Sequence, residues 1–272
     1  MKPASFDLVR ASSIAEATHL LDAGKGCARV IAGSQSLGPM LNLRLSQPQL
    51  IIDITGIPEL TRIEDDRDSI TVGACVTTAN IEDGCLPGEG LGMLARIASG
   101  IAYRAVRNRG TIGGSLCHAD PSADWLTVLS AIGAECFIRG TRGQRRLPLE
   151  QFVTGGYQTA LAGDEILEAI RLPRLSANGR LGYVKICRKV GEFALAMAAV
   201  RRDPERGAMR LAIGATNGCP IVIAADALMG RGGGLDEAAV YKLFDQHGMT
   251  DRVRRRQQFA ALSRAHAQAT VP

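Results

Sequence analysis

Hydrophobic and polar positions over the first 56 residues follow the pattern of a small α/β unit. Helical spacing bounded by Ser13, Glu16 and Gly24 predicts an amphipathic helix with a capping box at its start. Short apolar stretches predict the elements that follow, a strand over 28–31, an apolar helical segment over 37–45 and a strand over 50–54. The order strand, turn, helix, strand predicts parallel pairing, with the turn at the carboxyl end of a strand.

Beyond residue 60 the pattern changes to short alternating stretches around polar tips, which is typical of antiparallel hairpins. We expect strands at 62–64, 69–74, 135–139, 144–147 and 165–171. Helices are expected near 90–99 and from after Pro121 to about residue 131. This predicts a second, mostly antiparallel lobe.

The last hundred residues form a third unit after a plausible linker at 175–179. Strands are expected at 183–189, 196–202, 208–215 and 221–224, and terminal helices at 235–244 and 250–269. The whole chain is therefore predicted to be α+β. The units divide it into a first domain, 1–175, with lobes of about 1–56 and 57–175, and a C-terminal domain, 176–272.

Composition narrows the class of protein. With 272 residues and 46% hydrophobic side chains, the chain is long enough for substantial cores. No apolar run is long enough for a membrane span and no signal peptide is recognisable, so we expect a cytoplasmic protein. The formal charge is +5, and no aromatic residue interleaves with the basic run at 252–256, so nucleic acid is not an expected partner.

Cysteine and histidine placement argues against a metal or disulfide framework. The seven cysteines are scattered with no C-x-x-C, and the four histidines stand apart from one another. No metal site is therefore expected. The sequence also lacks a G-x-S-x-G elbow and a G-x-x-x-x-G-K-[ST] loop, which argues against a serine hydrolase and a nucleoside triphosphatase.

Two glycine-bearing turns are the strongest candidates for chemistry, and each precedes an expected helix. They are Ala32, Gly33, Ser34, Gln35, Ser36 and Leu37, and Thr111, Ile112, Gly113, Gly114 and Ser115. Small residues at a helix start let backbone N–H groups approach a phosphate closely. Arg104, Arg107 and Arg109 precede the second turn and raise the local positive potential. Together the turns predict a diphosphate cradle for a dinucleotide, although the first turn alone also fits an ordinary strand-to-helix connection.

The same motifs resemble a known family. The resemblance is carried by two motifs and by the residues around them. They are Ala-Gly-Ser-Gln-Ser-Leu at 32–37 with Arg44, Arg-Asn-Arg-Gly-Thr-Ile-Gly-Gly-Ser at 107–115, the following His118, Asp120, Pro121 and Asp124, and the segments 164–167, 183–189 and 191–196. These residues are similar to those of the FAD-binding medium subunit of molybdenum hydroxylases. Carbon monoxide dehydrogenase and xanthine dehydrogenase belong to that family. The resemblance spans nearly the whole chain.

The resemblance implies a two-lobed FAD-binding domain of the vanillyl-alcohol-oxidase (PCMH) type, followed by the family's small α+β C-terminal domain. It implies that the two turns hold the diphosphate and that Asp124 binds a polar part of FAD. It also places Ile101 and Leu167 along the flavin and Lys185 near the polar edge of the flavin. Without the resemblance, Asp124 fits a helix position, Ile101 and Leu167 fit core positions, and Lys185 fits a surface strand.

Three positions depart from the family pattern. Ser34 stands where glycine is usual, Ser115 where asparagine is frequent, and Phe193 where relatives often carry tyrosine near the flavin. If the backbone at residue 34 requires glycine, Ser34 is strained.

The implied function is electron transfer within a multi-subunit oxidoreductase. The flavin would accept electrons one at a time from a [2Fe-2S] small subunit and pass them to a terminal acceptor. A molybdenum cofactor-binding large subunit would oxidise the substrate, in an (LMS)2 assembly, that is, a dimer of heterotrimers. No catalytic nucleophile or general base is then expected in this chain. The alternatives are a self-sufficient flavin oxidoreductase and a non-catalytic nucleotide-binding module.

Overall fold

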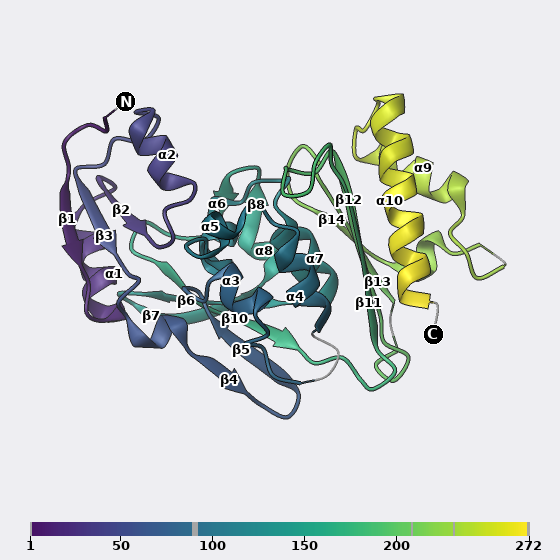
Figure 1. The fold of residues 1–272 in the computed structure, drawn as a ribbon, viewed down its shortest axis with the longest axis horizontal. Coiled ribbons are helices and arrows are strands. Elements are labelled where there is room, and N and C mark those ends of the chain that lie inside the picture. Colours follow the sequence, from purple (N-terminus) through teal and green to yellow (C-terminus); the bar gives the residue numbers. More distant parts are fainter. Residues whose placement is uncertain (1, 89–91, 208, 231, 271–272) are drawn as a thin grey trace.

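The computed structural model describes residues 2–88, 92–207, 209–230 and 232–270. Over these residues three main sheets follow one another along the longest axis of the molecule, from the N-terminus to the C-terminus (Figure 1). The sheets are called here the N-terminal, central and C-terminal sheets. Both helices and strands contribute to the cores, which confirms the predicted α+β class.

The N-terminal sheet is parallel, as predicted. Its strand order is β1 (Asp7–Arg10), β3 (Leu50–Asp53), β2 (Ala28–Ile31), and its helices are α1 (Ile14–Ala23) and α2 (Leu37–Asn42). The Ser13 side chain accepts the Glu16 N–H and caps α1, which confirms the predicted helix start. The Glu16 carboxylate, however, accepts the N–H of Ser12 at 2.7 Å instead of the Ser13 N–H, so the reciprocal contact lies one residue earlier.

The central sheet is antiparallel throughout, which confirms the predicted hairpins. Its order is β4 (Ile63–Asp65), β5 (Ser69–Gly73), β10 (Ile166–Pro173), β6 (Glu135–Gly140), β7 (Gly143–Pro148). The shorter elements around it are the 3-10 helix η1 (Pro58–Thr61), helices α3 (Thr78–Glu82), α4 (Gly92–Ser99), α5 (Arg104–Arg107), α6 (Ile112–His118) and α8 (Leu149–Phe152), and the ribbon β8 (Val153–Gly155) with β9 (Gln158–Thr159). Residues 90 and 91 of the expected helix at 90–99 lie outside the described residues.

The C-terminal sheet is the predicted meander. Its strands are β11 (Arg180–Ile186), β12 (Ala196–Arg202), β13 (Arg210–Gly214) and β14 (Ile221–Ala224), with the 3-10 helix η2 (Ala225–Leu228) and helices α9 (Glu237–Gln246) and α10 (Arg252–Thr270). Residue 208 of the third expected strand lies outside the described residues. Helix α10 lies across β11 and β12 (Figure 1). Gly182 allows this approach, because a Cβ there would lie 1.9 Å from the Ala265 carbonyl oxygen.

Helix α7 (Asp124–Ile132) joins the central and C-terminal sheets. All of its residues are buried, and it contacts β12 and β13 as well as β10. A Cβ on Gly214 would lie 1.7 Å from the Thr127 hydroxyl oxygen, so the helix packs directly against the backbone of β13. Helix α7 thus packs against both sheets, and side chains from the central and the C-terminal sheet can meet near its start.

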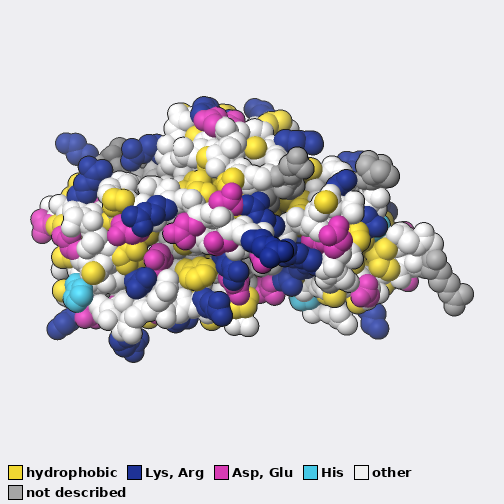
Figure 2. Space-filling model, turned by 90° about the horizontal axis from the view of Figure 1, so that it is seen from below, with side chains coloured by type: hydrophobic (Ala, Val, Ile, Leu, Met, Phe, Trp, Pro, Cys, Tyr) yellow, Lys and Arg dark blue, Asp and Glu magenta, His cyan; other side chains and the backbone are white. Residues whose placement is uncertain are grey.

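The surface carries charges of both signs. Figure 2 shows acidic and basic side chains interspersed over one face, with a group of basic side chains near its middle. Arginine–carboxylate pairs such as Arg139–Glu168 and Arg145–Glu165 lie along the central sheet, so much of the positive charge is locally balanced. No helix within the described residues has the length and apolar character needed to cross a membrane.

Candidate functional site

The two glycine-bearing turns lie against each other. Gly33 follows β2, and its Cα faces the backbone of Arg109 and Gly110, immediately before α6. A Cβ on Gly33 would lie only 1.9 Å from the Arg109 carbonyl oxygen. Because backbone cannot yield as a flexible side chain can, the contact between the two turns requires glycine at this position.

A cleft of about 320 Å³ opens where the two turns meet. Its lining residues come from both lobes: Gly33, Thr55, Thr61, Ile63, Cys75, Val76, Thr77, Asn80, Cys85, Asn108, Arg109 and Thr111. Half of these residues, four threonines and two asparagines, carry hydroxyl or amide side chains, and Arg109 is the single charged residue among them. Hydrogen-bonding groups and one cation within a partly apolar lining suit a ligand that carries a sugar and phosphates.

The first turn presents a row of unpaired amides. Within the described part of the chain, the N–H groups of residues 33–37 have no hydrogen-bond acceptor. Ser34 adopts φ 64°, in the left-handed region, which confirms that this position strains a residue other than glycine. Successive N–H groups around a left-handed residue form a concavity that binds anions. The first turn therefore fits a diphosphate.

The second turn contributes differently from the sequence expectation. The N–H groups of Ile112 and Gly113 donate to the carbonyls of Val76 and Ala74, and the Gly114 N–H donates to the Thr111 hydroxyl at 3.0 Å. A Cβ on Gly113 would lie 2.4 Å from the Ala74 Cβ, so this glycine allows α6 to pack against the end of β5. In this structure the turn brings Thr111 to the cleft and supports it by packing, and the role of residues 112–115 as cofactor contacts stays a prediction.

Of the three arginines before the second turn, only Arg109 leaves its charge uncompensated. Arg104 and Arg107 are paired with Glu82, and Arg104 also with Asp83. The hydrogen bond from Arg107 holds the pKa of the Glu82 carboxyl below its usual range. Among the described residues, the Arg109 side chain has no hydrogen-bond or ion-pair partner. The expectation that all three raise the potential of the cleft is thereby corrected to one.

Asp124 and Lys185 form a buried ion pair between the central and C-terminal sheets. The Lys185 Nζ lies 2.9 Å from Asp124 Oδ1, and the two side chains are 9% and 6% exposed. The Tyr183 hydroxyl donates to the same carboxylate oxygen at 2.6 Å, and Lys185 also donates to the Gly100 carbonyl at 2.9 Å. Burial, together with the nearby Asp124, raises the pKa of Tyr183 well above its usual value. Tyr183 was not identified from the sequence.

The two predicted flavin-lining apolar residues belong to the same hydrophobic core, and neither lines the cleft. Ile101 is half-buried and its backbone forms an isolated parallel bridge with Gly191. Leu167 is 3% exposed and belongs to the core above the central sheet, not to the cleft lining. Neither placement tests contact with a flavin, and both assignments stay predictions.

Nine of the twelve cleft residues were not identified as site residues from the sequence, among them Thr77, Asn80 and Asn108. Thr77 and Asn80 cap α3 through reciprocal side-chain and backbone hydrogen bonds, and Asn108 follows α5. A Thr-x-x-Asn capping pattern is visible in the sequence, but it reports a helix start and not a ligand site. Asn108 stands between Arg107 and Arg109, and its position next to the second turn was the available signal.

The amino-acid sequence is similar to those of known proteins. The family model described as "FAD binding domain in molybdopterin dehydrogenase" matches residues 4–175. The chain is 35% identical over 221 residues to the nicotine 6-hydroxylase medium subunit of Paenarthrobacter nicotinovorans, covering 80% of this chain and 77% of that protein. It is 34% identical over 224 residues to the carbon monoxide dehydrogenase medium chain of Hydrogenophaga pseudoflava, covering 82% and 78%.

The fold matches a solved structure over almost its full length. A chain of carbon monoxide dehydrogenase from Hydrogenophaga pseudoflava, in a form that lacks the Mo-pyranopterin moiety of the molybdenum cofactor, superposes with a TM-score of 0.88. The two chains are 30% identical, and the match covers 99% of this chain and 98% of the other. The likeness thus includes the C-terminal sheet as well as the lobes that form the cleft.

Proposed function

We propose that this chain, which belongs to the family of FAD-binding domains in molybdopterin dehydrogenases, is the FAD-carrying electron-transfer subunit of a multi-subunit molybdenum hydroxylase. The observation that carries the proposal is the cleft between the two turns. Five consecutive amides, beginning at the lining residue Gly33, have no acceptor among the described residues, and the uncompensated Arg109 lines the cleft, so both are available to a ligand of negative charge. Similar proteins are named as medium subunits or chains of nicotine 6-hydroxylase and carbon monoxide dehydrogenase.

Bound FAD would supply reversible uptake and release of electrons. The chain's residues bind and orient it: the amides of 33–37, Arg109 and Thr111 would hold the diphosphate, and Asn80 and the neighbouring hydroxyl groups would pair with the polar remainder of the nucleotide. Gly33 keeps the two walls of the cleft in contact.

The residues at the sheet junction would serve the other end of the cofactor. We assign Asp124 to a polar group of FAD, Lys185 to the polar edge of the flavin, and Ile101 and Leu167 to its apolar surroundings. The buried Asp124–Lys185 pair supports this assignment, because a lysine held by a carboxylate and a carbonyl is fixed in position.

The proposal extends to partners, domains and location. A molybdenum-binding large subunit and a [2Fe-2S] small subunit would complete an (LMS)2 assembly, consistent with relatives named as subunits of complexes. The match to residues 4–175 supports a first domain of 1–175 and a second of 176–272. All seven cysteines are free thiols, which supports a reducing, cytoplasmic setting.

Purification with FAD tests the proposal directly. We expect the chain to carry FAD or to be reconstituted with it, and Gly33→Ala to lose FAD because its Cβ would collide with the Arg109 carbonyl. Gly163→Ala is the matched control, since no atom lies within 4 Å of a Cβ placed there. A wild-type chain that cannot bind FAD, or a Gly33→Ala chain that binds it normally, contradicts the proposal.

A second experiment measures how much the charge of Arg109 contributes to FAD binding. Arg109→Gln should weaken FAD binding and reduce its dependence on salt concentration, because one charge-assisted contact is worth roughly 1.5–3 kcal/mol. Riboflavin, which lacks phosphates, should bind both forms alike. Equal losses for FAD and riboflavin would show that Arg109 acts on the fold and not on the diphosphate.

A further inference from the structure

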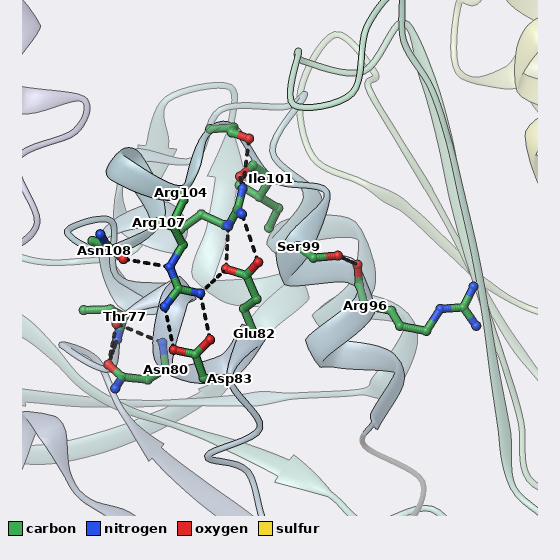
Figure 3. Close-up of polar contacts among 11 residues, drawn as sticks. Thr77, Asn80, Glu82, Asp83, Arg96, Ser99, Ile101, Arg104, Arg107 and Asn108 are labelled. Atoms are coloured by element: carbon green, nitrogen blue, oxygen red, sulfur yellow. Dashed lines mark hydrogen bonds and ion pairs between the residues drawn. The ribbon is translucent and has the colours of Figure 1, made fainter.

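Arg107 connects two segments that are distant in sequence, through four hydrogen bonds of its guanidinium group. Its side chain is 10% exposed, and its Nε and Nη2 donate to the two oxygens of Glu82 at 2.7 and 2.9 Å. Its Nη1 donates to the carbonyls of Ile101 and Ala102 at 2.9 and 3.0 Å (Figure 3). One planar group therefore ties α3 to the 100–102 turn.

The 100–102 turn is also held from the C-terminal sheet. Ala102 adopts φ 46°, a conformation that costs a residue other than glycine about 1 kcal/mol. Its carbonyl faces Gly191, at φ 90°, where a Cβ would lie 2.7 Å from the Ala102 oxygen. Lys185 Nζ donates to the Gly100 carbonyl at 2.9 Å. The turn is thus held by Arg107 from α5 and by Lys185 and Gly191 from the C-terminal part of the chain.

We propose that Glu82 and Arg107 are positioning residues of the flavin site: they hold the 100–102 turn, and through it Lys185 and the loop around Gly191, in the arrangement that bound FAD requires. This inference rests on the proposed function. Glu82 neutralises and orients the arginine, and the arginine reaches the two carbonyls that a shorter or rounder cation does not reach together. Removing Glu82 leaves the buried Arg107 charge without its carboxylate, and removing Arg107 leaves the carbonyls of Ile101 and Ala102 without this donor.

Arg104 provides a matched comparison on the same helix. It shares the Glu82 carboxylate at 2.8 Å and also binds Asp83, yet its side chain is 47% exposed and its guanidinium bonds only to side chains: Glu82, Asp83 and Asn108 (Figure 3). Arg104→Gln therefore removes one positive charge from the same cluster and leaves the hydrogen bonds from Arg107 to the 100–102 turn intact. Arg107→Lys keeps the charge and loses the planar fork, and Glu82→Gln keeps the shape and loses the charge.

Hydrogen exchange of the FAD-free chain tests the positioning without any ligand. We expect Arg107→Lys and Glu82→Gln to speed exchange in peptides covering residues 100–103 and 188–193, and Arg104→Gln to leave both at the wild-type rate. Uniformly faster exchange across the chain would indicate general destabilisation and would overturn the proposal. If Arg107→Lys does not fold, Glu82→Gln decides the outcome.

FAD titration followed by visible circular dichroism of the bound flavin gives the second measurement. Arg107→Lys and Glu82→Gln should bind FAD about tenfold more weakly, as is usual when a group that orients a ligand contact is lost, and should change the flavin dichroism. Arg104→Gln should do neither. Wild-type affinity and spectrum in the two test variants would overturn the inference. If the wild-type chain binds no FAD, the proposed function fails, while the exchange measurement still reports on the turn.

Discussion

The backbone of Ser34 is strained, and Ser34 lies in the turn whose N–H groups, those of residues 33–37, have no acceptor among the described residues. It occupies φ 64°, and its Oγ would lie 2.6 Å from a Cβ on Gly38, so the side chain sits tightly against the start of α2. The left-handed conformation is what turns successive N–H groups toward one point. The chain therefore keeps the backbone shape of a glycine turn at the expense of stability.

Replacing Ser34 with glycine should stabilise the fold. The left-handed backbone is free of strain for glycine, and the gain is up to about 1 kcal/mol after the extra unfolded-state entropy of glycine is subtracted. Ser36→Gly is the control, since Ser36 has φ −111° and the same substitution there should be neutral or destabilising. Urea unfolding of both variants measures the difference, and a Ser34→Gly chain less stable than Ser36→Gly contradicts the argument.

Cys85 offers a footprint of the cleft. It is exposed and lines the cleft, and burial raises the pKa of its thiol, so alkylation should be measured at alkaline pH. FAD should slow the alkylation of Cys85 and leave that of Cys27 unchanged, because Cys27 is also exposed but lies outside the lining. Mass spectrometry of modified peptides gives both rates. An unchanged alkylation rate of Cys85 would show that FAD does not bind in this cleft.

At the residue scale, local patterns predicted which residues form turns but not which charges remain available. Gly33 and Thr111 were identified from small residues before helices. The neutralisation of Arg104 and Arg107 was not, because Glu82 and Asp83 precede them by more than twenty residues and nothing local relates the two segments. Pairing across such a separation is a property of the folded chain.

At the element scale, regular amphipathic segments were predictable and short or exposed ones were not. Helix α1 and strands β2 and β3 were found because they place apolar residues on one face. Strand β1 escaped notice because its residues are mostly exposed, with Leu8 63% exposed, so it lacks the alternation that marks a half-buried strand. Helices α3 and α5 span five and four residues, too few for a helical period to show.

Helix α10 should make the fold sensitive to mild acid. His266 is 7% exposed, its Nε2 has no partner among the described residues, and burial lowers its pKa from the usual 6.5. Below pH 6.5 the unfolded chain binds this proton more readily than the folded chain does. The contribution of His266 to stability is therefore complete above that pH and is lost as the pH falls towards its lowered folded pKa.

The measurement is the melting temperature as a function of pH. The wild-type melting temperature should fall below pH 6.5, and that of His266→Leu should fall less steeply. His247→Leu is the comparison variant, since His247 lies in the exposed turn after α9. Parallel curves for the wild type and His266→Leu would assign the acid sensitivity to other groups.

At the scale of the whole molecule, the proposed cofactor site depends on how the three sheets meet. The first turn comes from the N-terminal sheet, the second turn and Asp124 from segments around the central sheet, and Lys185 from the C-terminal sheet. Sequence order predicted the sheets, and the family resemblance linked their residues to one cofactor. The contacts themselves, such as α7 against Gly214, depend on packing between segments some ninety residues apart, which no local pattern contains.

The Asp124–Lys185 pair should couple the sheets energetically. Because both side chains are buried, Lys185→Met should destabilise the fold by about 3–5 kcal/mol, since it leaves the Asp124 charge without its ion-pair partner. Asp124→Asn in the same chain should recover part of this loss, because the amide oxygen still accepts the Tyr183 hydroxyl and no buried charge remains. A double-mutant cycle by urea unfolding measures the coupling. Strictly additive losses would show that the pair does not hold the sheets together, and the position of Lys185 would then depend on its bond to the Gly100 carbonyl alone.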